Sequence, residues 1–244
     1  MLVDAHIHVG MFKDIKSVLL CAQDNNIVPV CVSTSLEEGK DLLSSLKESS
    51  LKVPVFLGIH PWYMQKHGFD EELLDSLIKD TNVKGIGECG LDNKIDIPLH
   101  EQIDLLSLQL DYAAMHNLPV NLHIRGYHGD LHRVLKQYQG RLRGIIHNTT
   151  FSYDVCRKYL DSGFLLSVGH HLTYMQKKLT DVLLKVGLDN LLLETDFDYE
   201  YTGEFDPTLL KSEYECLSML FQHKIESIET VLYNNLKDLL GNIK

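Results

Sequence analysis

The sequence lacks several features that mark specialised classes of protein. Its 244 residues contain five cysteines, an odd number with no Cys-x-x-Cys pair, so we predict reduced thiols rather than a disulfide framework. Basic residues are outnumbered, with 23 Lys and Arg against 34 Asp and Glu and a net charge of -11. This acidic balance argues against broad binding to nucleic acid or anionic membranes. It still permits a nuclease whose metal ions supply local positive charge.

Long apolar runs are also missing. No stretch approaches the roughly 18 apolar residues of a membrane span, and no basic segment followed by an apolar run opens the chain. We therefore expect a cytoplasmic protein without a leader or a membrane partner. The sequence has no Ser- or Gly-rich linker and no low-complexity tract. It is thus predicted to form one domain over residues 1–244, and no obligate protein partner is inferred.

Short apolar runs alternate with longer amphipathic segments along the whole chain. The runs predict strands at 2–6, 27–32, 53–59, 83–87, 119–122, 144–146, 164–168 and 191–193. The amphipathic segments predict helices at 13–25, 36–48, 70–79, 97–116, 131–138, 153–162, 176–186, 209–221 and 227–240. Eight strands alternating with helices are typical of an α/β protein with a (β/α)8 TIM barrel, regular or distorted.

Histidine is abundant, with 13 residues, and several lie where predicted strands end. His6 and His8 are two residues apart, so on a strand they would project from the same face. A His-x-His pair alone can be a chance feature of a polar strand edge. However, most of the predicted strands end in such residues: His6 and His8, His60, Glu88, His123, His147 and Asp196. Because catalytic residues of such barrels lie at the carboxyl ends of the strands, these side chains predict one site.

The residue types at these ends favour two divalent metal ions. Four histidines, a glutamate and an aspartate are more ligands than one tetrahedral ion takes. Glu88 is the natural bridge, because a carboxylate can bind two cations at once. Asp196 is placed to bind one ion and to accept a proton from an attacking water. Helix capping is the alternative interpretation for both carboxylates. Such a site would activate water for in-line displacement at a phosphoester.

The motifs resemble those of the TatD family of metal-dependent hydrolases, within the amidohydrolase-like barrels. The matching segments are DAHIH (4–8), GIHPWY (58–63), GIGECGLD (85–92), LPVNLHIR (118–125), IIH (145–147) and LLLETD (191–196). Gln102, Gln109 and the Asn-Asn-Leu at 234–236 also fit. The matches span nearly the whole chain. The resemblance implies a deoxyribonuclease that depends on magnesium, manganese or zinc.

The resemblance also implies a role for each position. His6, His8, Glu88 and Asp196 would hold one ion, and Glu88, His123 and His147 the other. His60 would contact the phosphate or another part of the substrate, although it could simply begin a helix before Pro61. Arg125 could pair with a phosphate, or orient Asp92 or another carboxylate at the barrel rim. Mixed imidazole and carboxylate ligands suit Zn, Mn, Fe or Co, and Mg less well.

The chain departs from the family pattern after Asp196. The family usually has a proline two residues further on and then a basic loop, whereas here Asp198 opens an acidic stretch over 198–206. An acidic wall would weaken binding to DNA. The resemblance predicts a metal-dependent phosphoester hydrolase, a TatD-like 3′ exonuclease on DNA, and the acidic stretch favours the hydrolase class over DNA as its substrate. The first alternative is a hydrolase of a small phosphoester, amide or lactone, and the second is a non-catalytic barrel that binds a metal or a partner.

Overall fold

Eight parallel strands form one sheet in the order β1 to β8, each paired with its neighbour in the chain. The structure is a computed structural model that describes residues 1–197 and 205–241. The strands are β1 (Leu2–Ile7), β2 (Ile27–Val32), β3 (Val55–Leu57), β4 (Val83–Asp92), β5 (Val120–Arg125), β6 (Gly144–Ile146), β7 (Phe164–Val168) and β8 (Leu191–Leu193). This arrangement confirms the predicted TIM barrel.

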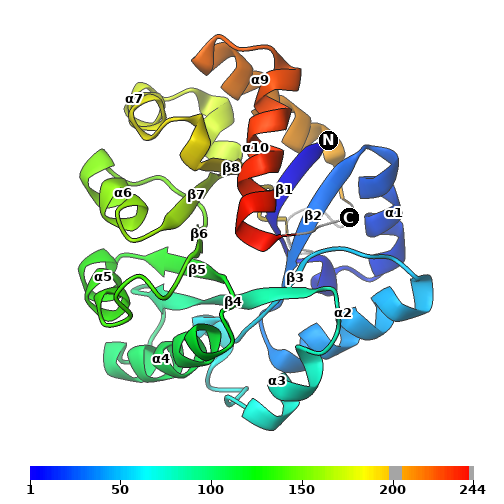
Figure 1. Cartoon of the computed structure of the whole chain (residues 1–244), viewed down its shortest axis with the longest axis vertical. Coiled ribbons are helices and arrows are strands. Elements are labelled where there is room, and N and C mark those ends of the chain that lie inside the picture. The colour runs from blue at the N-terminus through cyan, green and yellow to red at the C-terminus, as the bar shows by residue number, and fades with distance from the viewer. Residues whose placement is uncertain (198–204, 242–244) are drawn as a thin grey trace.

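Helices connect the strands and surround them (Figure 1). They are α1 (Ile15–Asp24), α2 (Leu36–Ser49), α3 (Glu71–Leu77), α4 (Leu99–Met115), α5 (His128–Lys136), α6 (Tyr153–Leu160), α7 (Lys177–Val186), α9 (Pro207–Phe221) and α10 (Ile225–Leu240). Short 3-10 turns are η1 (Val9–Met11), η2 (Pro61–Tyr63), η3 (His170–Tyr174) and η4 (Leu188–Asn190). No helix in the described ranges is long and apolar enough to cross a bilayer.

The barrel closes between β8 and β1 in an unusual way. The two strands are joined past the end of β8, where the Asp196 amide donates to the His6 carbonyl at 2.9 Å and the His8 amide to the Phe197 carbonyl at 3.0 Å. Below this point the buried Asp4 carboxylate accepts from the Thr195 amide and hydroxyl at 2.9 and 2.7 Å. A side chain thus links the strands where the ladder is open, and it fixes Asp196 beside His6.

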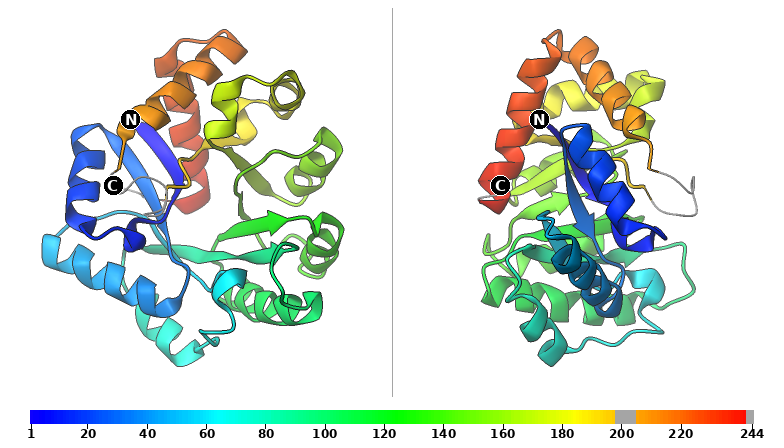
Figure 2. Two further views of the ribbon diagram at one scale, coloured as in Figure 1. Left: turned by 180° about the vertical axis from the view of Figure 1, so that it is seen from behind. Right: turned by 90° about the vertical axis from the view of Figure 1, so that its right-hand side faces the viewer.

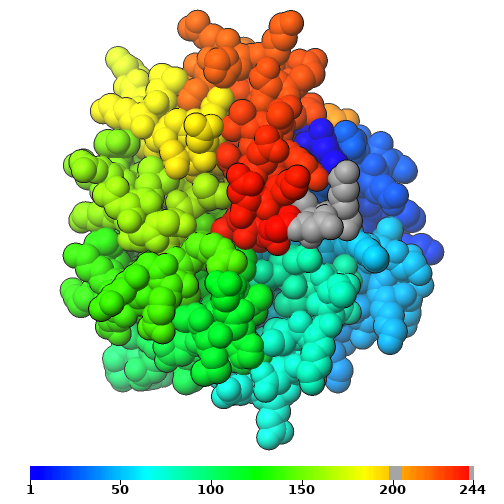
Figure 3. All heavy atoms as spheres, viewed as in Figure 1, coloured from blue at the N-terminus to red at the C-terminus, as the bar shows by residue number. Residues whose placement is uncertain are grey.

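The apolar core has two parts. The larger cluster lies between the strands and the surrounding helices, as in other barrels of this type. The smaller one fills the barrel interior with Val3, Val32, Phe56 and Leu192, and α10 covers it with Leu236. In the view of Figures 1 and 3, α10 lies across the middle of the barrel, and Figure 2 shows the barrel from behind and from the side. One end of the barrel is therefore sealed by α10, and the site lies at the other end.

Two strands extend further than their apolar runs predicted. β4 continues to Asp92 and β5 to Arg125, where the sequence pattern ended them at 87 and 122. The extra residues pair in parallel, with Gly90 opposite His123. The strand prediction was too short because polar side chains at the end of a barrel strand interrupt the hydrophobic run while the ladder continues. Glu88 and His123 therefore lie within strands rather than in loops.

Candidate metal centre

Glu88 lies at the middle of the site, and its two carboxylate oxygens face different histidines. It is 2 % exposed. Its Oε2 lies 3.3 Å from Nε2 of both His6 and His8. Its Oε1 lies 3.0 Å from His123 Nδ1 and 2.9 Å from His147 Nε2. One carboxylate is therefore shared between two pairs of imidazoles that come from different strands.

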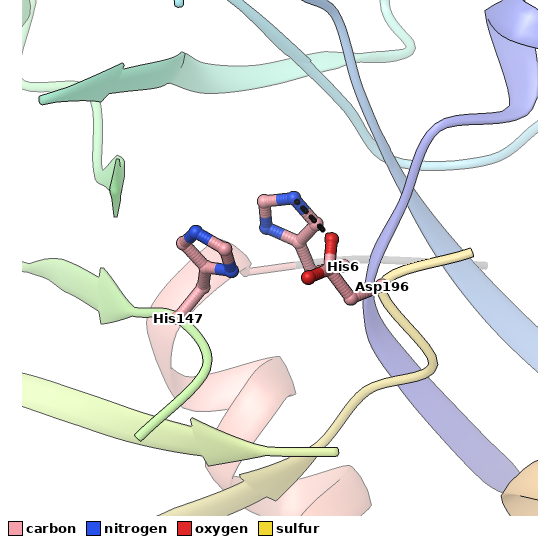
Figure 4. A group of neighbouring side chains, drawn as sticks. All are labelled: His6, His147 and Asp196. Atoms are coloured by element: carbon pink, nitrogen blue, oxygen red, sulfur yellow. Dashed lines mark ion pairs between the residues drawn. The ribbon is translucent and has the colours of Figure 1, made fainter. Parts of the chain in front are cut away.

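Asp196 joins the pair on the Oε2 side. Its Oδ1 lies 3.7 Å from Nε2 of His6 and of His8. Figure 4 shows His6 and Asp196 pointing toward each other, with His147 beside them. Asp196 has a positive φ of 49°, and its Oδ2 accepts from Asn148 Nδ2 at 3.2 Å. The side chain of Asp196 is 31 % exposed, so this carboxylate is much more open to solvent than Glu88.

Polar partners behind the histidines set which ring nitrogen faces Glu88. His6 Nδ1 lies 3.0 Å from Asn121 Oδ1, and His123 Nε2 lies 3.1 Å from Asp92 Oδ2. An amide oxygen and a carboxylate can only accept, so these ring nitrogens carry the proton. The opposite nitrogens, His6 Nε2 and His123 Nδ1, then direct a lone pair at the centre. This arrangement is common behind metal-binding histidines.

Glu194 lies behind His147. It is fully buried, accepts from the Asn148 amide at 2.6 Å and from the Ser167 hydroxyl, and lies 3.6 Å from His147 Nδ1. The segment that follows β8 thus contributes to the centre twice, through Glu194 behind His147 and through Asp196.

His60 has one of its two predicted roles, the start of a turn before Pro61, while its contact with the substrate stays a prediction. Its Nδ1 accepts from the Trp62 amide at 3.2 Å, which caps η2. Its Nε2 lies 3.4 Å from Glu88 Oε1. The preceding residue is held by Gln109, which bonds both the amide and the carbonyl of Ile59 at 2.8 and 3.2 Å. His60 therefore begins the turn and also contacts the central carboxylate.

The charges of this buried cluster depend on one another. Burial raises the pKa of Glu88, but the surrounding imidazoles outweigh it and hold that pKa well below its usual value. Burial opposes protonation of His8 and His147, yet Glu88 with its neighbouring carboxylates raises the pKa of His8 to about 9 and that of His147 well above its usual value. Burial dominates for His60 and lowers its pKa to about 4. A positive charge beside Glu88 therefore stabilises the cluster.

The donor atoms fit a divalent cation. His6 Nε2 and His8 Nε2 are only 3.3 Å apart, and His123 Nδ1 and His147 Nε2 only 3.0 Å. Two nitrogen lone pairs at this separation repel each other unless a proton or a metal cation lies between them. Among the described residues, donor atoms within 4.8 Å of one another form three groups: His6, His8 and Glu88; His6, His147 and Asp196; and His60, Glu88 and His123. Imidazole with carboxylate is a donor set typical of zinc, manganese or iron sites.

A cavity of about 580 Å³ opens over this cluster. Besides the cluster, its lining includes Arg125, Trp62, Phe151 and His171. Arg125 is exposed, and no ion pair or side-chain hydrogen bond joins it to Asp92 within the described ranges; Asp92 Oδ2 instead accepts from Trp62 and His123. The expectation that Arg125 orients Asp92 is therefore wrong in this structure. Most of the acidic 198–206 stretch lies outside the described residues.

Comparison with known proteins decides the family. The family model described as TatD related DNase matches residues 3–241. The chain belongs to this family. An uncharacterized metal-dependent hydrolase of Escherichia coli, YjjV, is 31 % identical over 202 residues, which cover 80 % of this chain and 78 % of YjjV. An uncharacterized metal-dependent hydrolase of Haemophilus influenzae is 30 % identical over 193 residues, which cover 73 % of this chain and 74 % of the relative.

A crystal structure of the TatD homolog YjjV from Escherichia coli superposes with a TM-score of 0.86. It covers 99 % of this chain and 98 % of its own, at 28 % identity. This chain is thus a TatD-family metal-dependent hydrolase, as its motifs predicted.

Sequence reasoning missed several residues of this TatD site. Asn121, Asn148 and Glu194 were not assigned a function, although Asn121 and Glu194 stand inside the matching motifs. The signal available for Asn121 and Glu194 was a polar residue inside an otherwise apolar run, two positions before a predicted ligand. On a strand that spacing places both side chains on one face.

Proposed function

We propose that the protein hydrolyses phosphoester bonds with two divalent metal ions and acts on DNA as a 3′ exonuclease. The position of Glu88 supports this proposal most strongly. Its two oxygens face separate sets of imidazoles, at 3.3 Å on one side and 2.9 to 3.0 Å on the other. A shared carboxylate of this kind suits paired ions, and paired ions suit in-line displacement at phosphorus.

The residues divide between two positions. Glu88 Oε2, His6, His8 and Asp196 would hold one ion. Glu88 Oε1, His123 and His147 would hold the other. The ions would be zinc, manganese, iron, cobalt or magnesium, and when bound they would polarise a phosphoryl oxygen and acidify a water.

Asp196 is assigned the transfer of the proton from the attacking water. Its carboxylate is 31 % exposed, so water can reach it from the cavity, and Asn148 holds one of its oxygens. The other oxygen is directed at His6 and His8. A general base must lie within hydrogen-bond reach of the proton that it removes, and Asp196 is the most open carboxylate of the cluster.

His60 and Arg125 are assigned to the substrate. Both line the cavity. Arg125 carries a permanent positive charge at the exposed end of β5, where it would attract a phosphate. His60 lies at the floor, next to Glu88. DNA as the substrate class is supported by the description of the family, TatD related DNase.

The test is release of nucleotides from a 3′-labelled single-stranded DNA with manganese or magnesium. Wild type should release nucleotides stepwise, and Glu88→Gln should reduce the rate to background because the amide cannot bind two cations. Glu101→Gln, at an exposed position of α4, is the matched control and should retain full activity.

Two outcomes would contradict parts of the proposal. If Glu88→Gln cleaves as fast as wild type, the two-ion assignment is wrong. If neither protein cleaves DNA but wild type hydrolyses a small phosphomonoester in a Glu88-dependent way, the centre is retained and DNA is the wrong substrate.

A further inference from the structure

The indole of Trp62 is exposed but held in one orientation. It is the only tryptophan in the chain and is 51 % exposed at the cavity. Its Nε1 donates a 2.7 Å hydrogen bond to Oδ2 of the buried Asp92. The ring also meets the His60 imidazole edge-on, with centroids 5.3 Å apart and planes at 81°. One edge of the indole is therefore anchored while about half of its surface faces solvent.

Such an arrangement has an energetic cost unless something covers the ring. Exposed apolar area is unfavourable, and a large aromatic ring normally buries most of it. Here the anchor keeps the ring at the cavity wall instead of letting it fold onto the core. Fixing an aromatic ring in advance reduces the entropy lost when a partner stacks on it.

Other described lining residues indicate what the partner looks like. Phe151 and Ile124 provide apolar wall, while Arg125 provides the positive charge. The floor is the Glu88 cluster. A ligand that fits this lining has a phosphate at one end and a planar apolar ring at the other.

We propose that Trp62 is a specificity-determining residue, the surface on which a nucleobase of the substrate stacks while the adjoining phosphoester lies over Glu88. This inference deepens the proposed function and rests on it for the chemistry at phosphorus. Stacking on aromatic side chains is tolerant of base identity because every base has a π-face. Trp62 would thus select for the presence of a base and not for its sequence.

The anchor also connects substrate binding to the metal centre. Asp92 Oδ2 accepts from Trp62 Nε1 and from His123 Nε2, so the stacking surface and a candidate metal ligand share one acceptor. A base on Trp62 would therefore be positioned relative to His123 through a single buried carboxylate. This makes Trp62 a substrate-binding residue and secondarily a positioning residue.

The fluorescence of wild type reports directly on this site, because it has no other tryptophan. With magnesium present, dAMP should change the emission saturably. Deoxyribose 5-phosphate, which has the phosphate but no base, should bind at least about 5-fold more weakly. Equal affinity of the two ligands by calorimetry, or no change in emission on saturation with dAMP, would overturn the proposal.

Two variants separate stacking from anchoring. Trp62→Leu should weaken dAMP by about 5- to 150-fold, the range found for loss of base stacking, and should raise KM for single-stranded DNA. Trp62→Phe keeps a ring but loses the N–H, so it should retain more dAMP affinity than Trp62→Leu. An oligonucleotide with an abasic 3′ nucleotide should be cleaved equally by wild type and Trp62→Leu at saturation.

The two proposals fail in different ways. If DNA is not cleaved but dAMP still binds through Trp62, the proposed function is wrong while base stacking on Trp62 is retained. If DNA is cleaved in a Glu88-dependent way while Trp62→Leu binds dAMP as wild type does, the inference alone is wrong. A Trp62→Leu variant with reduced kcat on every substrate and unchanged KM would show a positioning role only, and would also refute stacking.

Discussion

Replacing Asp92 by asparagine should weaken metal binding without unfolding the protein. Asp92 Oδ2 accepts from Trp62 Nε1 at 2.7 Å and from His123 Nε2 at 3.1 Å, and its Oδ1 accepts from the Lys94 amide at 2.7 Å. Burial raises the pKa of Asp92, but the hydrogen bonds from His123, Trp62 and Lys94 hold it at about 2. The group is therefore a carboxylate that accepts three bonds.

The geometry determines the size of the effect. An asparagine has one oxygen. If that oxygen occupies the Oδ2 position, the amide nitrogen faces the Lys94 N–H and one bond is lost. If it occupies the Oδ1 position, the amide nitrogen faces the N–H groups of Trp62 and His123, and two bonds are lost. The first orientation costs the least, about 1.5–3 kcal/mol for a hydrogen bond to a charged group. In that orientation His123 keeps its hydrogen bond but loses the negative charge behind it, and mutation of such a partner typically weakens metal affinity or activity by about 10- to 100-fold.

The assay is competition for the metal with a chromophoric chelator, with unfolding curves recorded on the same samples. Asp75→Asn is the matched control, because Asp75 also accepts a 2.7 Å bond, from the Tyr112 hydroxyl, and does not line the cavity. Metal affinity should fall in Asp92→Asn and not in Asp75→Asn. Equal metal affinity in the two variants would refute the argument that Asp92 orients His123.

Two further predictions concern stability. Glu213 on α9 is 1 % exposed, and neither of its carboxylate oxygens has a hydrogen-bond partner among the described residues. Burial, together with the negative charges of Asp4 and Glu194, raises the pKa of Glu213 well above 4.5. Wild type should lose stability as pH rises from 4.5 toward the folded pKa. Glu213→Gln should remove this loss, about 1.4 kcal/mol per pH unit in that window, in urea unfolding; a constant difference at all pH values would count against it. Chelation should lower Tm by about 5–11 °C relative to protein with metal at about 100 times Kd, and Glu88→Gln should show no such shift.

The barrel was predictable because its pattern is local. Each strand and helix has its own periodicity, and strand ends of a parallel barrel meet at one rim, so residues as distant as His6 and Asp196 could be placed together from sequence. The central position of Glu88 follows from the same rule. Which histidines contact Oε1 of Glu88 and which contact Oε2 could be learned only from the structure.

Contacts behind the histidines were not predictable, since they depend on register between strands. Asp92 lies opposite Arg125 in the β4–β5 ladder, which made their pairing reasonable, yet the carboxylate is occupied by Trp62 from η2 and by His123. Likewise the Asp4 carboxylate spans the open part of the β1–β8 junction, and no local pattern marks that gap. The start of a turn at His60 was predictable from the Pro61 that follows it, whereas the contact of its Nε2 with Glu88 depends on the fold.

The most direct test of the central claim is the anomalous scattering of manganese or zinc in crystals of the loaded protein. We expect two peaks about 3.5–4 Å apart, one beside each oxygen of the Glu88 carboxylate, with His6, His8 and Asp196 around one and His123 and His147 around the other. A single peak, or two peaks that do not share Glu88, would contradict it.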